Sequence, residues 1–367
     1  MKKALVILLL AGMILSLCSC GPGKPEVETT DRIVKMGRVM ANLVTLDVWH
    51  TSLNPTFQVS DAVFDRLLDK NPETLELECN LIEDFPTVSD DRTTYTFKLK
   101  EGVKFHDGTE LTSEDVEFTF NYFYARETAS DNTWVCEVIK GCTEMMAGEA
   151  DTLAGFKVID KYRFSIELLY PYSAFESVLA VSMLPILPRK ARLEAGEAWG
   201  MDVLIGSGPY KLKSFEPGES LELEVNQEYH GHVPNVDGIK MLNMDDSTAL
   251  IEWEAGNIDL AGVPSALVPD YEKRFPDNLH KQVLVGTVRL QLNPSIAPLD
   301  DINVRKAIAM AVDKTELVEG YYENNVVAIN GIIPEGIPGF NNNVPLDGWK
   351  CDPEGAKQLL IDSGYPS

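Results

Sequence analysis

The stretch from Tyr95 to Phe123 carries the strongest local folding signals in this chain. It opens with apolar side chains at alternate positions, which is the period-two pattern of a half-buried β-strand. The alternating apolar residues are Tyr95, Phe97 and Leu99. Two glycine-containing pairs, Glu101-Gly102 and Asp107-Gly108, then predict tight turns. We therefore expect a strand that turns twice and leads directly into the next element.

That next element is predicted to be a helix over residues 113–126. Thr112 stands before the acidic residues of the first turn and is a typical hydroxyl N-cap. One apolar stripe comprises Val116, Phe120 and Phe123. Phe118 and Tyr122 lie on another side, because two residues rotate a helix by roughly 200°. The second aromatic face is either buried between two layers or lines a cleft.

The N-terminus has the features of a secretory signal. Two lysines precede residues 4–15, an uncharged apolar run of 12 residues, which is short of the roughly 20 residues that a membrane-spanning helix needs. The following segment, LCSCG, resembles the lipobox of bacterial lipoproteins. The resemblance implies removal of residues 1–19 and a diacylglycerol thioether on Cys20. The alternative is a signal peptide that merely contains cysteines.

Residues 20–32 then have no apolar periodicity, so we interpret them as a tether between the lipid and the folded part. The 367 residues are enough for two or more domains. The formal net charge of −25 argues against nucleic acid or anionic lipid as a partner. Cys136 and Cys142 are candidates for a disulfide, although free buried thiols fit the sequence equally well, and the states of Cys79 and Cys351 stay open.

Strand and helix patterns alternate irregularly along the rest of the chain, which predicts α/β or mixed α+β layers rather than a barrel. The expected strands are 33–40, 156–159, 163–168, 210–215, 220–226, 239–244, 258–260 and 283–292. The expected helices are 57–68, one from Ser173 to Leu184, one capped by Asp246 or Ser247, one capped by Asp300 or Asp301, and one from Asp352 to Gly364.

Four separated blocks of this sequence resemble the bacterial extracytoplasmic solute-binding proteins of family 5. The blocks are GVKFHDG with LTSEDV at 102–116, GSGPYKL at 206–212 with Asn226 and Tyr229, GNIDL at 256–260, and the segment from Asn293 to Lys314 with its proline loop. Residues 356–365 resemble the helix that follows in the family. The blocks occur in the family's order, and the resemblance covers nearly all of residues 33–367.

The resemblance implies a periplasmic-binding-protein-like fold of type II, the peptide-binding class, with two lobes around a cleft. It places lobe I at 33–262 and a partial lobe II at 263–367, with hinge crossings near 262–266. Family members are longer, so the second lobe is expected to be incomplete. The implied function is capture of peptides outside the membrane for the permease and ATPase subunits of an ABC importer. Nickel or another small solute, or a surface lipoprotein without a transport role, are the alternatives.

Several residues are candidates for ligand contacts in such a protein. Leu46 and Asp47 sit where the family has a ligand-contacting segment, and Phe118 matches a helix position that carries an aromatic residue near the ligand. The full set of candidates is Leu46, Asp47, Trp49, His50, Phe118, Trp134 and Asn293. Each has a plainer interpretation as a core or turn residue, and Asp47 has one as a turn cap.

The sequence offers little support for an enzyme. It contains no GxxxxGK[ST], GxGxxG or HExxH motif, and Gly206-Ser207-Gly208 is not a nucleophile elbow. His106-Asp107 lies in a turn that Gly108 explains structurally. His230 and His232 could bind a metal if the chain is extended there, but they match a surface loop of the family. We expect a binding protein with no catalytic residues, no cofactor and no bound metal.

Overall fold

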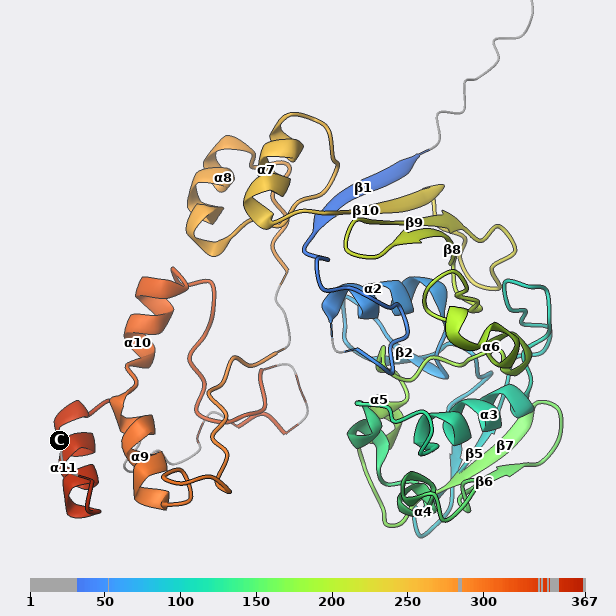
Figure 1. Ribbon diagram of the computed structural model, residues 1–367, viewed down its shortest axis with the longest axis horizontal. Helices are drawn as coiled ribbons and strands as arrows, with labels where there is room; N and C mark the ends of the chain where they lie inside the picture. Colours follow the sequence, from blue (N-terminus) through green and yellow to red (C-terminus); the bar gives the residue numbers. More distant parts are fainter. Residues whose placement is uncertain are drawn as a thin grey trace, which may run out of the picture.

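The computed structural model of the protein describes residues 32–51, 53–282, 286–335, 337, 339–341, 343 and 350–365 (Figure 1). The expected signal segment, Cys20 and nearly all of the tether lie outside this range. In the described ranges the chain forms strands in two four-stranded sheets and one small pair, with helices between and beyond them. No helix in that part of the chain is both long enough and apolar enough to cross a bilayer.

The first sheet joins the start of the described chain to strands that come much later. Its order is β1 (Ile33–Arg38), β10 (Gly238–Asn243), β9 (Ser220–Val225) and β8 (Tyr210–Glu216). β1 is parallel to β10, and the other pairs are antiparallel. The expected hairpin at 210–226 is confirmed. The strands expected at 33–40 and 239–244 are confirmed as β1 and β10.

The second sheet is the one that the strongest sequence signal predicts. Its order is β4 (Thr87–Val88), β5 (Thr94–Lys98), β7 (Arg163–Glu167) and β6 (Phe156–Val158), all antiparallel. Aromatic rings on one face stack across the strands, with Phe164 4.9 Å from Phe97 and 5.3 Å from Phe156 between ring centroids. A small antiparallel pair, β2 (Leu68–Lys70) and β3 (Leu77–Cys79), lies apart from both sheets in the hydrogen-bond pattern.

Helix α3 (Ser113–Tyr124) covers the second sheet as the capping pattern predicts (Figure 1). The Asp115 carboxylate accepts the Thr112 backbone N–H at 2.9 Å, which forms half of a capping box. The stripe of Val116, Phe120 and Phe123 is fully buried. The other oxygen of Asp115 accepts the backbone N–H of Arg189 at 3.1 Å, so the start of α3 also fixes the start of α6 (Arg189–Ala195).

Two expected helices differ from the structure because tertiary hydrogen bonds end them. The helix predicted at 57–68 is α2 (Asn54–Val63), whose last carbonyl accepts the N–H of Gly208 at 2.9 Å. The helix predicted from Ser173 to Leu184 is reduced to α5 (Phe175–Val178). The carbonyls of Ser182 and Met183 instead accept side-chain donors from Ser60 and Trp49.

After β10 the chain forms helices with fewer long-range partners. α7 (Asp246–Glu254) is capped by Asp245, one residue before the predicted cap, and α8 (Val268–Arg274) follows. The expected strand at 258–260 is only a single bridge between Leu260 and Met36. A short helix, α4 (Cys142–Ala147), belongs to the earlier part of the chain, where Cys136 and Cys142 are both buried free thiols.

The last helices are α9 (Ile302–Ala311), α10 (Lys314–Glu316) and α11 (Pro353–Asp362), which Figure 1 shows away from the sheets. The predicted caps of α9 and α11, Asp301 and Asp352, are confirmed. The strand predicted at 283–292 is wrong over 286–292, where the chain is irregular and Val288 is 83% exposed. Its first three residues, 283–285, lie outside the described ranges. An alternating segment becomes a strand only where a neighbouring strand pairs with it.

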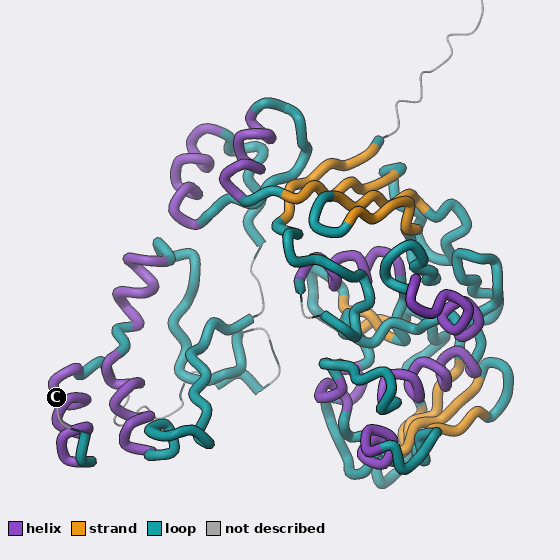
Figure 2. Tube along the Cα trace, in the orientation of Figure 1, coloured by secondary structure: helices purple, strands orange, loops and turns teal. Residues whose placement is uncertain are grey.

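The main hydrophobic core is formed by residues between Met40 and Met241 and includes side chains from both four-stranded sheets. Figure 2 shows the strands of these sheets in that part of the chain. Many of the strongly exposed apolar side chains lie later, between Val288 and Ile361. Over the described ranges the fold is therefore a layered mixture of sheets and helices without a closed barrel, as the sequence predicts. The division at residue 262 stays a prediction.

Candidate functional site

Two of the blocks that carry the family resemblance meet around His106 and act as scaffold. The backbone N–H of Gly206 donates to His106 Nδ1 at 3.2 Å, and Nε2 donates to the Gly208 carbonyl at 3.0 Å. The ring is thus neutral, and burial lowers the pKa of His106 to about 4. A Cβ on Gly206 would lie 2.0 Å from the Val63 carbonyl oxygen, so the close approach of this segment to Val63 requires glycine.

A second buried cluster forms around Asp65. Its carboxylate accepts hydrogen bonds from Tyr229 Oη at 3.0 Å, His230 Nε2 at 2.9 Å and Asn80 Nδ2 at 3.1 Å. Burial alone would raise the pKa of Asp65, but the His230 and Asn80 hydrogen bonds outweigh it and hold the pKa below its usual value. His230 is therefore engaged with a carboxylate rather than presented with His232 to a metal. In the described ranges no group of three or more His, Cys, Asp or Glu side chains could hold a metal ion.

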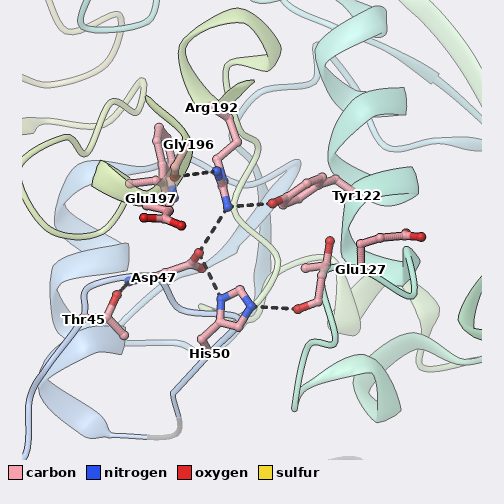
Figure 3. A pocket seen from close by; sticks show the side chains of 10 residues that line it. Thr45, Asp47, His50, Tyr122, Glu127, Arg192, Gly196 and Glu197 are labelled. Carbon is pink, nitrogen blue, oxygen red and sulfur yellow. Dashed lines mark hydrogen bonds and ion pairs between the residues drawn. The ribbon is translucent and has the colours of Figure 1, made fainter. Parts of the chain in front are cut away.

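An open pocket of about 430 Å³ lies beside α3 and α6 (Figure 3). Its walls come from the segment after β1, from α3 and the loop that follows it, and from α6 with the turn after it. The lining residues are Thr45, Asp47, His50, Tyr122, Glu127, Thr128, Arg192, Gly196, Glu197 and Trp199. We call this the α3–α6 pocket. Its size is in the range of small-molecule sites.

Asp47 lies at the centre of the cluster that Figure 3 shows, and only 7% of the residue is exposed. Oδ1 accepts the Trp49 backbone N–H at 3.1 Å, which is the turn-capping role that the sequence also allows. Oδ2 faces two basic groups, His50 Nδ1 at 3.1 Å and Arg192 Nη2 at 3.7 Å. Asp47 therefore combines a structural bond with an ion cluster inside the pocket.

His50 carries a proton on both ring nitrogens in this arrangement. Nδ1 faces the Asp47 carboxylate, and Nε2 lies 2.7 Å from the Thr128 carbonyl oxygen. Both oxygens can only accept, so each ring nitrogen must donate. The hydrogen bond to Asp47 is the main reason that the pKa of His50 is raised above its usual value.

Arg192 is the third member of the cluster and is only 8% exposed. Nη2 donates to Tyr122 Oη at 2.6 Å, and Nη1 donates to the Gly196 carbonyl at 3.3 Å. The guanidinium carbon lies 4.7 Å from the Tyr122 ring centroid and 5.4 Å from that of Trp199. Arg192 Nε is buried and has no hydrogen-bond partner in the part of the chain that the structure describes.

The structure brings two of the sequence-predicted site residues, Asp47 and His50, into the pocket. Leu46 and Trp49 are each 1% exposed and belong to the core beneath it. Trp49 packs on Phe123 at 5.3 Å between centroids and donates its Nε1 to the Met183 carbonyl at 2.9 Å. This packing and this hydrogen bond give Trp49 a structural role that requires no contact with a ligand.

The other three predicted site residues lie outside the α3–α6 pocket. Phe118 is half-buried and stacks on Tyr122 at 5.3 Å between ring centroids. Trp134 stands in a 3₁₀ turn over Thr133–Cys136 and is 66% exposed. Asn293 is exposed, and its side chain accepts the Ser295 N–H at 2.9 Å. Their roles in ligand binding stay predictions.

Sequence reasoning missed Arg192, Tyr122 as a hydrogen-bond partner, and Trp199. The segment PRKARLEAGE reads as a charged surface helix, and nothing in its periodicity singles out one arginine for burial. The available signal was weak: an arginine three residues after Arg189 and seven before a tryptophan, on a helix that a proline precedes.

The chain matches the sequence model described as bacterial extracellular solute-binding proteins, family 5, over residues 76–367. The protein therefore belongs to family 5 of the bacterial extracellular solute-binding proteins, as its sequence blocks predict.

Curated relatives are similar over much of this chain. The dipeptide-binding protein of Escherichia coli K12 is 27% identical over 316 residues, which cover 82% of this chain and 58% of the relative. The oligopeptide-binding protein OppA of Bacillus subtilis is 26% identical over 270 residues, which cover 70% of this chain and 48% of the relative. The chain thus spans about half the length of these relatives.

Solved structures show the same fold. An oligopeptide-binding protein, OppAIV, of Borrelia burgdorferi matches with a TM-score of 0.79 and 28% identity, covering 91% of this chain and 67% of that one. OppA of Haemophilus influenzae, solved with the peptide RPPGFSPFR, matches with a TM-score of 0.75 and 22% identity, covering 91% and 67%. These neighbours are two-lobe periplasmic binding proteins, which confirms the predicted fold class.

Proposed function

We propose that this protein captures peptides outside the cytoplasmic membrane and delivers them to the permease of an ABC importer. The observation that carries the proposal is membership of family 5 together with peptide binding in the names of its relatives. One solved relative also holds a nine-residue peptide. Another relative is named a heme-binding protein, so the family alone does not fix the ligand.

The exposed indole of Trp134 is the predicted contact that is most available to a peptide. Its loop is tied to the segment of Asp47 and His50, because Asn132 Nδ2 donates to the Val48 carbonyl at 2.9 Å. An exposed ring held on a fixed loop loses little entropy when a ligand packs on it. Trp134→Ala should therefore weaken peptide binding by about tenfold or more. Phe85→Ala removes an aromatic ring that is 49% exposed elsewhere and serves as the matched control.

We further propose that Cys20 carries a lipid that anchors the protein to the outer face of the cytoplasmic membrane. The order of leucine, a small residue and cysteine after an apolar run supports this. Cells that express the protein with radiolabelled palmitate should label it, and Cys20→Ser should abolish the label. Cys18→Ser is the control and should leave the label intact. Label that survives Cys20→Ser would refute the anchor.

Peptide capture itself can be tested on native protein. Protein isolated from membranes of the source cells is incubated with a di- to hexapeptide library, and its unfolding temperature is measured. A bound ligand stabilises the native state by mass action, so the unfolding temperature should rise. An unchanged unfolding temperature with every peptide pool would contradict the proposal.

A further inference from the structure

The α3–α6 pocket is complete within residues 45–199. All of its lining residues come from the part of the chain that precedes β8, so it does not need the later helices to form. The binding proposed for this pocket does not depend on the proposed peptide transport.

The inner part of the pocket carries surplus positive charge. The Asp47 carboxylate faces two cations, the doubly protonated His50 ring and the Arg192 guanidinium. One negative charge against two positive charges leaves one positive charge unbalanced. Because Arg192 and Asp47 are both nearly buried, water screens this charge poorly.

Hydrogen-bond donors in this region are also incompletely used. Arg192 has five N–H groups, but only one Nη1 and one Nη2 hydrogen bond lie within normal range, and Nε has no partner. Tyr122 Oη accepts from Arg192, which leaves its own proton free to donate. Thr128 Oγ1 is likewise buried without a partner among the residues described. Surplus donors and surplus positive charge both favour a carboxylate.

The rim of the pocket has the opposite character. Glu127 and Glu197 are exposed, and neither has a hydrogen-bond or ion-pair partner within the described ranges. Figure 3 shows them on opposite sides of the Asp47–Arg192–His50 cluster. Two unpaired carboxylates beside a pocket favour an ammonium group over an anion.

We propose that the α3–α6 pocket binds a small zwitterion, a free α-amino acid, with its carboxylate toward Arg192 and its ammonium group toward Glu127 and Glu197. An anion alone meets repulsion at the rim, and a cation alone meets the positive inner cluster. A molecule with both charges matches both regions, and about 430 Å³ accommodates one of this size. The rings of Tyr122 and Trp199 supply apolar wall for its side chain.

Three matched probes separate these possibilities by calorimetric titration of the full chain. Leucine carries both charges, leucinamide lacks the carboxylate, and N-acetyl-leucine lacks the ammonium group. Leucine should bind at least about tenfold more tightly than either, since each lost charged contact costs more than about 1.4 kcal/mol. Leucinamide or N-acetyl-leucine binding as tightly as leucine, or no heat from leucine at millimolar concentration, would overturn the proposal.

Substitutions at exposed or unpartnered positions then locate the site without endangering the fold. Glu197→Gln should weaken the binding of leucine, because it removes a carboxylate that attracts the ammonium group. The same change should strengthen the binding of N-acetyl-leucine, because it removes a negative charge that repels this anion. Glu194→Gln, an exposed acid on α6 that does not line the pocket, should change neither. Equal effects of the two variants, or no effect of Glu197→Gln, would overturn the assignment.

A hydroxyl pair provides a second comparison. Thr128→Val removes a buried hydroxyl without a partner, so the fold should keep its stability while leucine affinity falls by about threefold to tenfold. Thr56→Val removes a similar unpartnered hydroxyl in α2, away from the pocket, and should leave affinity unchanged. An unchanged leucine affinity in Thr128→Val would contradict the role given to this donor. Peptide capture, measured separately, reports on the proposed transport function.

Discussion

Acid should weaken the fold through His106, which joins two distant segments of the chain. The ring accepts from Gly206 and donates to Gly208, a pattern that needs one protonated and one unprotonated nitrogen. Protonation of Nδ1 would replace an acceptor with a second donor facing a backbone N–H. The pKa of His106 in the fold is therefore about 4, against about 6.5 for an unfolded chain.

The sign and size of the effect follow from this difference. Between these two values the unfolded chain binds more protons than the native protein, so stability falls as the pH falls. A drop from about pH 7.5 to about pH 4.5 then costs about 2.5 kcal/mol of unfolding free energy. Because His106 is partly exposed, we expect a measured value of about 1 to 2.5 kcal/mol.

The assay compares urea unfolding of the unmodified protein and of His106→Asn at both pH values. Asparagine offers one acceptor and one donor but does not titrate, so the variant should lose less stability on acidification. The difference between the two losses isolates His106 from the carboxylates that also titrate. His232→Gln, at an exposed histidine, should keep the full acid sensitivity. Identical pH dependence in the unmodified protein and in His106→Asn would refute the neutral-ring assignment.

The other predictions concern the α3–α6 pocket and the buried clusters. The folded-state pKa of His50 is raised, so its stabilising effect should be full below about pH 6.5 and fade as the pH rises. In urea titrations, the stability gap between the unmodified protein and His50→Gln should accordingly shrink as the pH rises above about 6.5. A gap that stays constant would argue against a charged ring. Trp49→Ala should cost about 3 to 5 kcal/mol in the same assay, because the ring is almost fully buried. Asp65→Ala should cost about 3 kcal/mol or more, because Tyr229, His230 and Asn80 lose their shared acceptor. A loss below about 1 kcal/mol in either variant would contradict its structural role.

Local sequence signals predicted the elements whose ends are set by nearby residues. Asp115 caps α3 from three residues beyond Thr112, and Asp301 and Asp352 cap their helices over similarly short distances. The alternating strands of the second sheet also follow from sequence, because each buries one face on the same aromatic layer. In these places a short window of sequence contains the interactions that decide the structure.

Predictions failed where a distant segment decides the outcome. α2 stops at Val63 because Gly208, far along the chain, bonds to that carbonyl. Residues 286–292 alternate like a strand but pair with no strand among the residues that the structure describes. Arg192 is buried only because α3 brings Tyr122, 70 residues earlier, against it. Asp47 and His50 were found through the family resemblance, whereas their ion cluster with Arg192 is a property of the fold.

Peptide capture by native protein tests the central claim most directly. Protein isolated from source-cell membranes is mixed with a di- to hexapeptide library, separated from free peptide by gel filtration, and denatured to release what it holds. Mass spectrometry of the released fraction should show peptides enriched well above a sample that was unfolded before mixing. A released fraction that matches the unfolded control would contradict the assignment of this family 5 protein to peptide capture.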